Sequence, residues 1–315
     1  MNLREHIYEA KKNGVAIGHF NASTLDGIIA IADAAQSMKV PVIVGLSEGE
    51  RDYVGVKTAV AIVKSLREER GQPIFLNADH TYSFDRVKEA IDAGFDSVIF
   101  DGAQLSLEEN IKVTKKCVEY AKSVSIERSN PPAGGEGSKD SRSSEVILGG
   151  KGSYSSILIE GELGFIGTSS KILDAIPDGA VTREVEMTKP TDAERFVRET
   201  GVDLLAPAVG NVHGVVRGGD PALNIGRVKL VADAVPVPLV LHGASGNTAD
   251  DIRAAIRAGV AVVHVNTELR IAYRGGLVLS LTENREELSP YKYLKPAKLA
   301  MQKVVEEKLK IFGMK

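Results

Sequence analysis

Residues 73–102 of the 315-residue chain read PIFLNADHTYSFDRVKEAIDAGFDSVIFDG. Two short apolar runs in this stretch, PIFLN and SVIF, flank the amphipathic helical pattern FDRVKEAIDA. Such runs are typical of buried parallel strands, which need a crossover connection, usually a helix, between them. Polar residues follow each run, Asp79 and His80 in the first case and Asp101 in the second. The stretch therefore predicts a strand–helix–strand unit that gathers polar side chains at one edge.

The same alternation continues along the whole chain. Apolar runs lie at 15–19, 41–46, 73–77, 97–100, 157–159, 203–206, 238–241 and 261–265. Amphipathic helical patterns separate most of them, at 25–37, 55–67, 84–93, 107–122, 191–200 and 248–258. Eight such units predict an α/β fold, the closed (β/α)8 or TIM barrel, as a single domain over residues 1–315. An open doubly wound sheet is the alternative, but the strand count and the lack of a Gly-rich turn after the first run disfavour it.

Composition and charge narrow the class of function. The net charge is −3 with both signs interspersed, which indicates no nucleic-acid-binding face and favours a small-molecule ligand. Residues 1–14 are polar and charged, unlike a signal peptide, and no apolar stretch approaches the roughly 18 residues of a membrane span. We therefore expect a cytoplasmic protein with no membrane contact. Because Cys117 is the only cysteine, histidines and carboxylates would have to hold any metal.

Two segments are longer than the connections that a minimal barrel needs between its strands and helices. Residues 129–156 are rich in Ser, Gly, Pro and charge, which predicts a mobile insertion before the fifth strand. Residues 165–189 form a long connection after that strand, without clear periodicity, as lid loops often do. Apolar spacing predicts a last helix at 296–312, packed on the barrel or on a partner subunit. We expect a homodimer or homotetramer.

Histidines gather at the expected carboxyl ends of the strands, where barrel enzymes place their active sites. Five of the six histidines lie there: His19, His80, His213, His242 and His264. Separate buried histidines would be scattered over the fold, so this clustering favours a metal site. His80, His213 and His242 stand near small residues, and catalytic Zn2+ takes three protein ligands with one position left open. We therefore expect these three to bind zinc or another divalent cation.

Acidic residues at the same ends complete a candidate site. Asp79 precedes a proposed ligand at the barrel rim, where a carboxylate can move a proton while a metal polarises a neighbouring carbonyl. The alternative for Asp79 is a turn or helix-capping role ahead of Thr81. Asp101 and Glu162 follow adjacent strands, where they can orient the imidazoles or hold a second cation.

Small residues beside the proposed ligands suit a phosphate. Gly214, and the run Gly243, Ala244 and Ser245, each come directly after a histidine of the proposed trio. Glycine lets backbone amides approach a bound group, and successive amides form anion-binding nests. The alternative for the second motif is an ordinary turn into the next helix.

Eight motifs occur in order along the chain. They are GHFN at 18–21, SEG at 47–49, ADH at 78–80, FDG at 100–102, EGELG at 160–164, GNVHG at 210–214, HGASG at 242–246 and NTELR at 266–270. With these motifs the chain resembles the class II fructose-1,6-bisphosphate aldolases and the related tagatose-bisphosphate aldolases. The likeness covers nearly the whole chain outside 129–156 and the lid.

The resemblance implies a Zn2+ enzyme of glycolysis or related carbohydrate metabolism. Such an enzyme reversibly cleaves a ketose phosphate, such as fructose 1,6-bisphosphate, to dihydroxyacetone phosphate and an aldehyde, here glyceraldehyde 3-phosphate. The trio of histidines would be its ligands, Asp79 its proton donor, and Asp101 with Glu162 an alternative metal position. The implied substrate residues are Gly214, Gly243, Ala244 and Ser245 for the ketone phosphate, Asn21 and Ser47 for the aldehyde half, and His264, Val265, Asn266 and Thr267 beside them.

Two positions outside the lid depart from the family pattern. His264 stands where the family usually has an asparagine that contacts the enediolate, although Asn266 lies nearby. The tripeptide SPY at 289–291 replaces Asp-Pro-Arg, whose arginine can meet the distal phosphate. The first change alters the enediolate contact, and the second weakens the case for a bisphosphate substrate.

The lid departs from the family as well. Ser169 and Ser170 replace an acidic pair whose glutamate handles the carbon-bound proton. Glu184 and Glu186 are the nearest candidate bases on the same connection, with Asp174 and Asp178 as alternatives there. His264 is the alternative that needs no lid movement, and Glu184 and Glu186 would otherwise be exposed charges of a strand or loop.

Two other functions share these features. A metal-dependent sugar-phosphate isomerase or epimerase would use the same cation and proton shuttle without breaking a carbon–carbon bond. A catalytically altered homologue with a binding or scaffold role would explain the missing lid glutamate and the insertion. A lysine-dependent aldolase is disfavoured, because no lysine stands at any of the eight strand ends.

Overall fold

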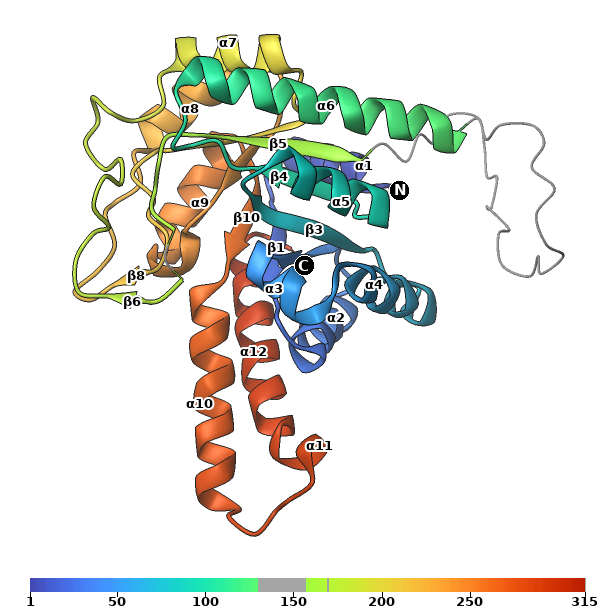
Figure 1. Ribbon diagram of the computed structural model, residues 1–315. Coiled ribbons are helices and arrows are strands. Elements are labelled where there is room, and N and C mark those ends of the chain that lie inside the picture. The colour runs from blue at the N-terminus through green and yellow to red at the C-terminus, as the bar shows by residue number, and fades with distance from the viewer. Residues whose placement is uncertain (130–156, 169, 315) are drawn as a thin grey trace, which may run out of the picture.

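Eight parallel strands close into a barrel in the computed structural model, which describes residues 1–129, 157–168 and 170–314 (Figure 1). Their bounds are β1 Ile17–Asn21, β2 Val42–Leu46, β3 Ile74–Thr81, β4 Ser97–Phe100, β5 Leu158–Leu163, β7 Leu204–Pro207, β9 Leu239–Leu241 and β10 Val260–Val265. The strands follow one another around the barrel in this order, and β10 pairs with β1 to close it. The predicted (β/α)8 barrel is confirmed, because each strand forms on one of the eight apolar runs.

Helices cover the outside of the barrel. Their bounds are α2 Leu25–Met38, α3 Glu48–Val54, α4 Val56–Arg70, α5 Phe84–Ala93, α6 Leu107–Ser129, α7 Pro190–Thr200, α8 Ile225–Ala234 and α9 Ala249–Ala258. Local signals set their ends: the Thr24 hydroxyl accepts from the Gly27 amide at the start of α2, and Gly201 ends α7 with a φ of 69°. Their apolar faces pack on the strands. No described helix is long and apolar enough to cross a membrane.

A helix that the apolar pattern does not predict closes the other end of the barrel. α1 (Leu3–Asn13) starts from a capping box and buries Leu3, Ile7 and Ala10. These side chains pack with interior residues from the amino-terminal parts of the strands, such as Ile17. Because α1 fills this end, the carboxyl-terminal end is left for a site, as in other TIM barrels.

The predicted lid, 165–189, contains a strand of its own. β6 (Ile172–Leu173) pairs in parallel with β8 (Val215–Val216), which begins two residues after His213. This small sheet ties the connection to the loop that carries a proposed metal ligand. Of the mobile insertion predicted at 129–156, Ser129 is the last residue of α6, and residues 130–156 lie outside the described residues.

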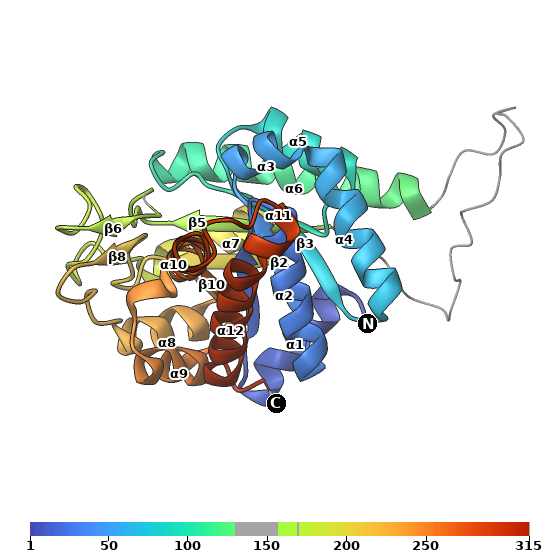
Figure 2. The same cartoon turned by 90° about the horizontal axis from the view of Figure 1, so that it is seen from below.

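The carboxyl-terminal helices form an arm beside the barrel (Figures 1 and 2). α10 (Thr267–Glu283) leads outward, α11 (Pro290–Tyr293) follows the turn, and α12 (Lys295–Ile311) returns against α10 and α2. Because α12 buries Val305 and Leu309 in the main core, the helix predicted at 296–312 does pack on the barrel. The arm also exposes several large apolar side chains: Val278, Leu279, Leu281, Leu288 and Tyr291.

Candidate active site

A cavity of about 330 Å3 opens at the carboxyl-terminal end of the barrel. Eleven of the predicted site residues line it: Asn21, Ser47, Asp79, His80, His213, Gly214, Gly243, Ser245, His264, Asn266 and Thr267. The rest of its lining is Glu48, Gly49, Tyr82, Thr168, Ser170, Lys171 and Arg270. Its place in the fold and its many polar groups are those of a TIM-barrel active site.

A β-bulge in β3 turns two neighbouring side chains toward this cavity. The pairing of β3 with β4 shifts by one residue between Ala78 and Thr81, and His80 takes a left-handed conformation with a φ of 40°. In a regular strand, adjacent side chains point to opposite faces. The bulge removes this alternation, so that Asp79 and His80 both line the cavity. A left-handed non-glycine residue is strained, and such strain is common where a side chain must be aimed.

Three imidazoles converge from different strand ends. The ring planes of His80 and His213 meet at 81°, those of His80 and His242 at 89°, and those of His213 and His242 at 54°. One nitrogen of each ring lies within 4.8 Å of the corresponding nitrogens of the other two. We call these residues the imidazole trio. Their rings enclose a common centre, as three ligands of one cation do.

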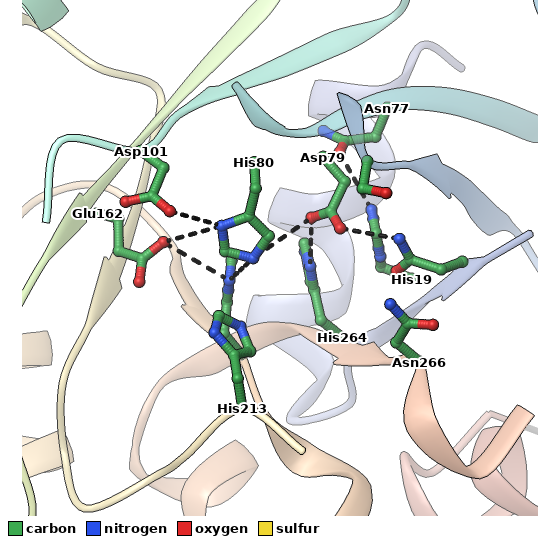
Figure 3. Close-up of polar contacts among 12 residues, drawn as sticks. His19, Asn77, Asp79, His80, Asp101, Glu162, His213, His264 and Asn266 are labelled. Atoms are coloured by element: carbon green, nitrogen blue, oxygen red, sulfur yellow. Dashed lines mark hydrogen bonds and ion pairs between the residues drawn. The ribbon is translucent and has the colours of Figure 1, made fainter. Parts of the chain in front are cut away.

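An acceptor holds the outer nitrogen of each ring in the imidazole trio. His80 Nδ1 donates to Asp101 Oδ2 at 2.9 Å (Figure 3). His242 Nε2 donates to Glu160 Oε1 at 2.7 Å, and His213 Nδ1 donates to the carbonyl oxygen of Gly167. Such outer contacts orient metal-binding histidines and turn their inner nitrogens toward one another. The inner nitrogens of His242 (Nδ1) and His80 (Nε2) lie 3.2 Å apart and share a hydrogen bond, which a bound cation would replace.

A second group of histidines is close together but not convergent. The rings of His19 and His264 are stacked, with centroids 3.5 Å apart and planes 3° apart, and His242 stacks on His264 at 4.1 Å. Nitrogen and oxygen atoms of His19, Asp79 and His264 also lie within 4.8 Å of one another. The lone pair of an imidazole lies in the plane of its ring, so the lone pairs of stacked rings lie in separate parallel planes and do not converge on one ion. Among the described clusters, the imidazole trio therefore fits a catalytic cation best.

The charges of the imidazole trio differ from ring to ring. Burial alone would lower the pKa of His80, but the carboxylates of Asp79, Asp101 and Glu162 raise it to about 10. Burial and the neighbouring His80 lower the pKa of His213 to about 4. Burial likewise holds the pKa of His242 well below its usual value. Two of the three rings are thus neutral at pH 7, as ligands must be, and only His80 has to lose a proton to a cation.

Buried carboxyl groups surround the imidazole trio. Burial raises the pKa of Glu160 and of Glu162 well above the usual value; Asp79 adds to the shift of Glu160, and Asp101 to that of Glu162. Glu162 Oε2 lies 3.4 Å from His80 Nδ1, and it has no hydrogen-bond partner among the described residues. A buried acceptor without a donor is costly unless a cation or a proton satisfies it. Together with Asp101, Glu162 could therefore accept a cation in an alternative position.

Asp79 is buried between the trio and the stacked rings. Asn21 Nδ2 donates to its Oδ2 at 2.8 Å, while Oδ1 lies 3.5 Å from His264 Nδ1 and 3.8 Å from His80 Nε2. Burial would raise the pKa of Asp79, but His80, His264 and His19 outweigh it and hold the pKa well below its usual range. Asp79 is therefore an ionised carboxylate at neutral pH, ready to take a proton.

Glu50 and Arg270 complete a network that the sequence analysis missed. Glu50 is only 6% exposed; its Oε2 accepts from Asn21 Nδ2 and Ser47 Oγ, both at 3.0 Å, and its Oε1 accepts from Arg270 Nη2 at 2.6 Å. The only sequence signal was their place in or just after the motifs SEG and NTELR. The network joins β1, α3 and α10, and it reaches Asp79 through Asn21.

Two glycines of the cavity lining bring backbone close to the cavity. Gly243 has a φ of 62°, and a Cβ there would lie 2.2 Å from the Val212 carbonyl oxygen. Gly214 has a φ of 104°, and its Cβ would lie 2.9 Å from the Lys171 carbonyl oxygen. Both positions therefore require glycine. Ser245 lies beside them in η1 (Ala244–Gly246), and its hydroxyl accepts from the Asn266 amide.

Two of the predicted substrate residues contribute no side chain to the cavity. Ala244 and Val265 are fully buried in the core around the barrel, because their side chains point away from it. Only their backbone groups remain for substrate contact.

The structure does not bring the two candidate lid bases to the cavity. Glu184 is exposed, with Oε1 4.0 Å from Arg227 Nη2, and Glu186 pairs with Arg183; neither glutamate belongs to the described lining of the cavity. Ser170 does line the cavity and accepts from Asn266 Nδ2 at 3.3 Å, whereas Ser169 lies outside the described residues. His264, the alternative base, already lines the cavity.

Comparisons with known proteins agree with this geometry. The profile of the family described as fructose-bisphosphate aldolase class-II matches residues 1–128 and 153–315. The chain is 34% identical to a fructose-bisphosphate aldolase of Staphylococcus aureus, over 99% of this chain and 97% of that protein. It is 33% identical to one of Geobacillus stearothermophilus, over 99% of this chain and 96% of that protein.

Solved structures are similar over the same length. The YdjI aldolase of Escherichia coli K12 is 27% identical, with a TM-score of 0.75, over 100% of this chain and 97% of that chain. A fructose-bisphosphate aldolase of Campylobacter jejuni, at 21% identity, shares the fold with a TM-score of 0.76, over 99% of this chain and 94% of that chain.

Proposed function

The chain belongs to the class II fructose-bisphosphate aldolase family, and we propose from this that it reversibly cleaves a phosphorylated ketose to dihydroxyacetone phosphate and an aldehyde. Fructose 1,6-bisphosphate, which would give glyceraldehyde 3-phosphate, is the first substrate to test. The observation that supports this most is the imidazole trio, in which an acceptor holds each outer ring nitrogen. This is the arrangement that a metal-dependent aldolase needs.

The cation in this proposal is Zn2+ or another divalent metal, held by His80, His213 and His242. When bound, it supplies positive charge that polarises the substrate carbonyl and stabilises negative charge on oxygen. Asp101 and Glu160 keep two of the rings oriented toward it. Asp101 and Glu162 are the candidates for an alternative or second cation position.

Asp79 is the proposed proton carrier. As an ionised carboxylate with one oxygen free of hydrogen bonds among the described residues, it can take the proton of a substrate hydroxyl during cleavage. In the condensation direction it returns that proton. Asn21 fixes the carboxylate by donating to its other oxygen.

The two halves of the substrate would lie on opposite sides of the cavity. We assign the ketone phosphate to the backbone around Gly214, Gly243 and Ser245, with Lys171 also in the cavity lining. Asn21 and Ser47 are assigned to the aldehyde half. His264, Asn266 and Thr267 line the space between, with the backbone of residues 244 and 265 close by.

For the carbon-bound proton we favour His264 over the lid. His264 already lines the cavity, whereas Glu184 or Glu186 could act only if residues 165–189 moved as a lid. Proton exchange on dihydroxyacetone phosphate in deuterated water separates these candidates. A drop for His264→Asn alone supports the imidazole, and a drop for Glu184→Gln or Glu186→Gln supports the lid, with metal content unchanged in each case.

The wider biological setting is also a proposal. The exposed apolar side chains of the arm, such as Leu279 and Leu288, suit burial against a second copy of this chain, so we propose a homodimer or homotetramer. We further propose a single-domain cytoplasmic enzyme of carbohydrate metabolism.

The direct test is the release of dihydroxyacetone phosphate from fructose 1,6-bisphosphate and other ketose phosphates, with and without a chelator. We expect release that the chelator abolishes and added Zn2+ restores. A sugar-phosphate isomerase or epimerase would convert the ketose without releasing dihydroxyacetone phosphate. A homologue with only a binding role would bind the ketose and convert none of it.

A further inference from the structure

A buried arginine lies against the β3 bulge. Arg51 belongs to α3, and its side chain is only 1% exposed. Its Nη1 donates to the carbonyl oxygen of Leu46 at 2.7 Å and to that of Asp79 at 3.1 Å. Its Nη2 donates to the Thr81 hydroxyl at 3.1 Å. Arg51 thus contacts the residue before His80 and the residue after it.

These contacts begin where the pairing of β2 with β3 ends. The last pair between the two strands joins Leu46 to Ala78. Beyond this pair β3 carries the bulge, and His80 has a φ of 40°. A strained conformation of this kind persists only when the surrounding structure holds it in place. Arg51 links the end of β2 to the residues on both sides of His80, and so it provides such a hold.

The burial of a guanidinium at this point is not explained by packing. Burial lowers the pKa of Arg51, and the carboxylates of Glu48 and Asp79 oppose this shift. A guanidinium stays charged in a protein, so the buried group is a cation. An apolar side chain of similar volume is often as stable in the core as a buried ion, or more so. The three hydrogen bonds around the bulge are therefore the feature that requires an arginine.

We propose that Arg51 is a positioning residue of the active site, whose guanidinium holds the β3 bulge so that His80 points into the imidazole trio. Arg51 is outside the described lining of the cavity, so it acts through His80 and not on the substrate. Without the guanidinium, His80 can relax from its left-handed conformation, and its ring then leaves the trio. This inference rests on the proposed metal-dependent function and adds a residue on which the metal site depends.

The sign of the change in metal affinity tests this role. Loss of the positive charge of Arg51, close to His80, would by itself strengthen the binding of a cation. Loss of the hold on His80 would weaken it. We expect Arg51→Met to weaken zinc affinity by about 10- to 100-fold, as the loss of contacts that orient metal ligands does. Competition with a metal indicator dye measures the affinity, and an unchanged or stronger affinity overturns the inference.

Arg67→Met is the matched control for a general loss of stability. Arg67 holds the other end of β3, because its Nε donates to the Ile74 carbonyl oxygen at 2.6 Å and its Nη2 donates to Asp96. We expect this variant to unfold at a lower temperature and, while folded, to keep the zinc affinity of the parent. Equal losses of affinity in Arg67→Met and Arg51→Met overturn the inference, because any weakening of β3 would then disturb the metal site.

Two variants of Thr81 test the same contact if Arg51→Met does not fold. Thr81→Val removes the hydroxyl that accepts from Arg51 Nη2, and Thr81→Ser keeps a hydroxyl there. We expect Thr81→Val to weaken zinc affinity and Thr81→Ser to keep the affinity of the parent. Equal zinc affinity in the two variants would then overturn the inference.

The parent protein separates this inference from the proposed function. A parent that binds no zinc contradicts the metal-dependent aldolase proposal, and the role of Arg51 with it. If the parent binds zinc and releases dihydroxyacetone phosphate while Arg51→Met keeps the same zinc affinity, the role of Arg51 alone is contradicted.

Discussion

Two groups of histidines lie at the same end of this barrel and differ in how their rings are held. In the imidazole trio the planes meet at 54° to 89°, and each outer nitrogen meets an acceptor. In the stack of His19 and His264 the planes are 3° apart. Both groups bring candidate ligand atoms within 4.8 Å of one another. A short distance between histidine nitrogens is therefore not enough to identify a set of metal ligands. The rings must also be oriented toward one centre, and the outer hydrogen bonds impose that orientation.

Removing a member of the trio should have the largest effect. We expect His213→Ala to lose both its bound metal and all measurable cleavage, because two imidazoles leave a catalytic zinc site incomplete. The measurement is elemental analysis beside the cleavage assay. The matched control is His19→Ala, which we expect to keep about one metal per chain once circular dichroism shows that it folds. Equal metal loss in both variants would contradict the view that the imidazole trio binds the metal and that the stack of His19 and His264 does not.

Asp79 lies between the two groups, and its loss should affect turnover but not metal. We expect Asp79→Ala to keep the cation and to lose cleavage on the order of 100- to 10,000-fold, as is typical for a general acid–base group. Metal content and kcat measured on the same preparation check this. Near-normal turnover would mean that Asp79 is only a turn residue of the β3 bulge.

The outer hydrogen bonds give the smallest of these effects. We expect Glu160→Ala to weaken metal affinity by about 10- to 100-fold, because His242 loses the acceptor that orients it. Glu160→Gln should lose less, since its amide oxygen can still accept. The counterpart in the stack is Asn77→Ala, which removes the partner of His19 Nε2 and should leave metal affinity unchanged. Competition with a metal indicator dye measures all three, and an equal loss for Asn77→Ala would argue against oriented ligands.

Most of the fold could be predicted from the sequence, because buried parallel strands produce uninterrupted apolar runs that alternate with helical patterns. α1 was not predicted, because a short polar helix that buries only Leu3, Ile7 and Ala10 has few apolar residues. The pairing of β6 with β8 was not predicted, because a strand of two residues is too short to show an alternation of apolar and polar residues.

Residues of the candidate site could be predicted only where the residue type and its place at a strand end are enough to indicate a role. Histidines and glycines at strand ends are visible in the sequence, and the cavity brings most of them together. The bulge that turns His80 beside Asp79, and the contact of Glu50 with Arg270, depend on pairing between distant segments. For the same reason nothing in the sequence indicated that Glu184 would lie outside the cavity lining, near Arg227.

X-ray absorption by the zinc-loaded protein tests the imidazole trio most directly. If His80, His213 and His242 are the ligands, the spectrum should fit about three imidazole nitrogens at roughly 2.0 to 2.1 Å, with a light atom from water or substrate in the remaining position. His213→Ala should then lose the three-imidazole signature. A parent protein that takes up no zinc, or one whose spectrum fits a single imidazole among oxygen ligands, would contradict the assignment of the trio.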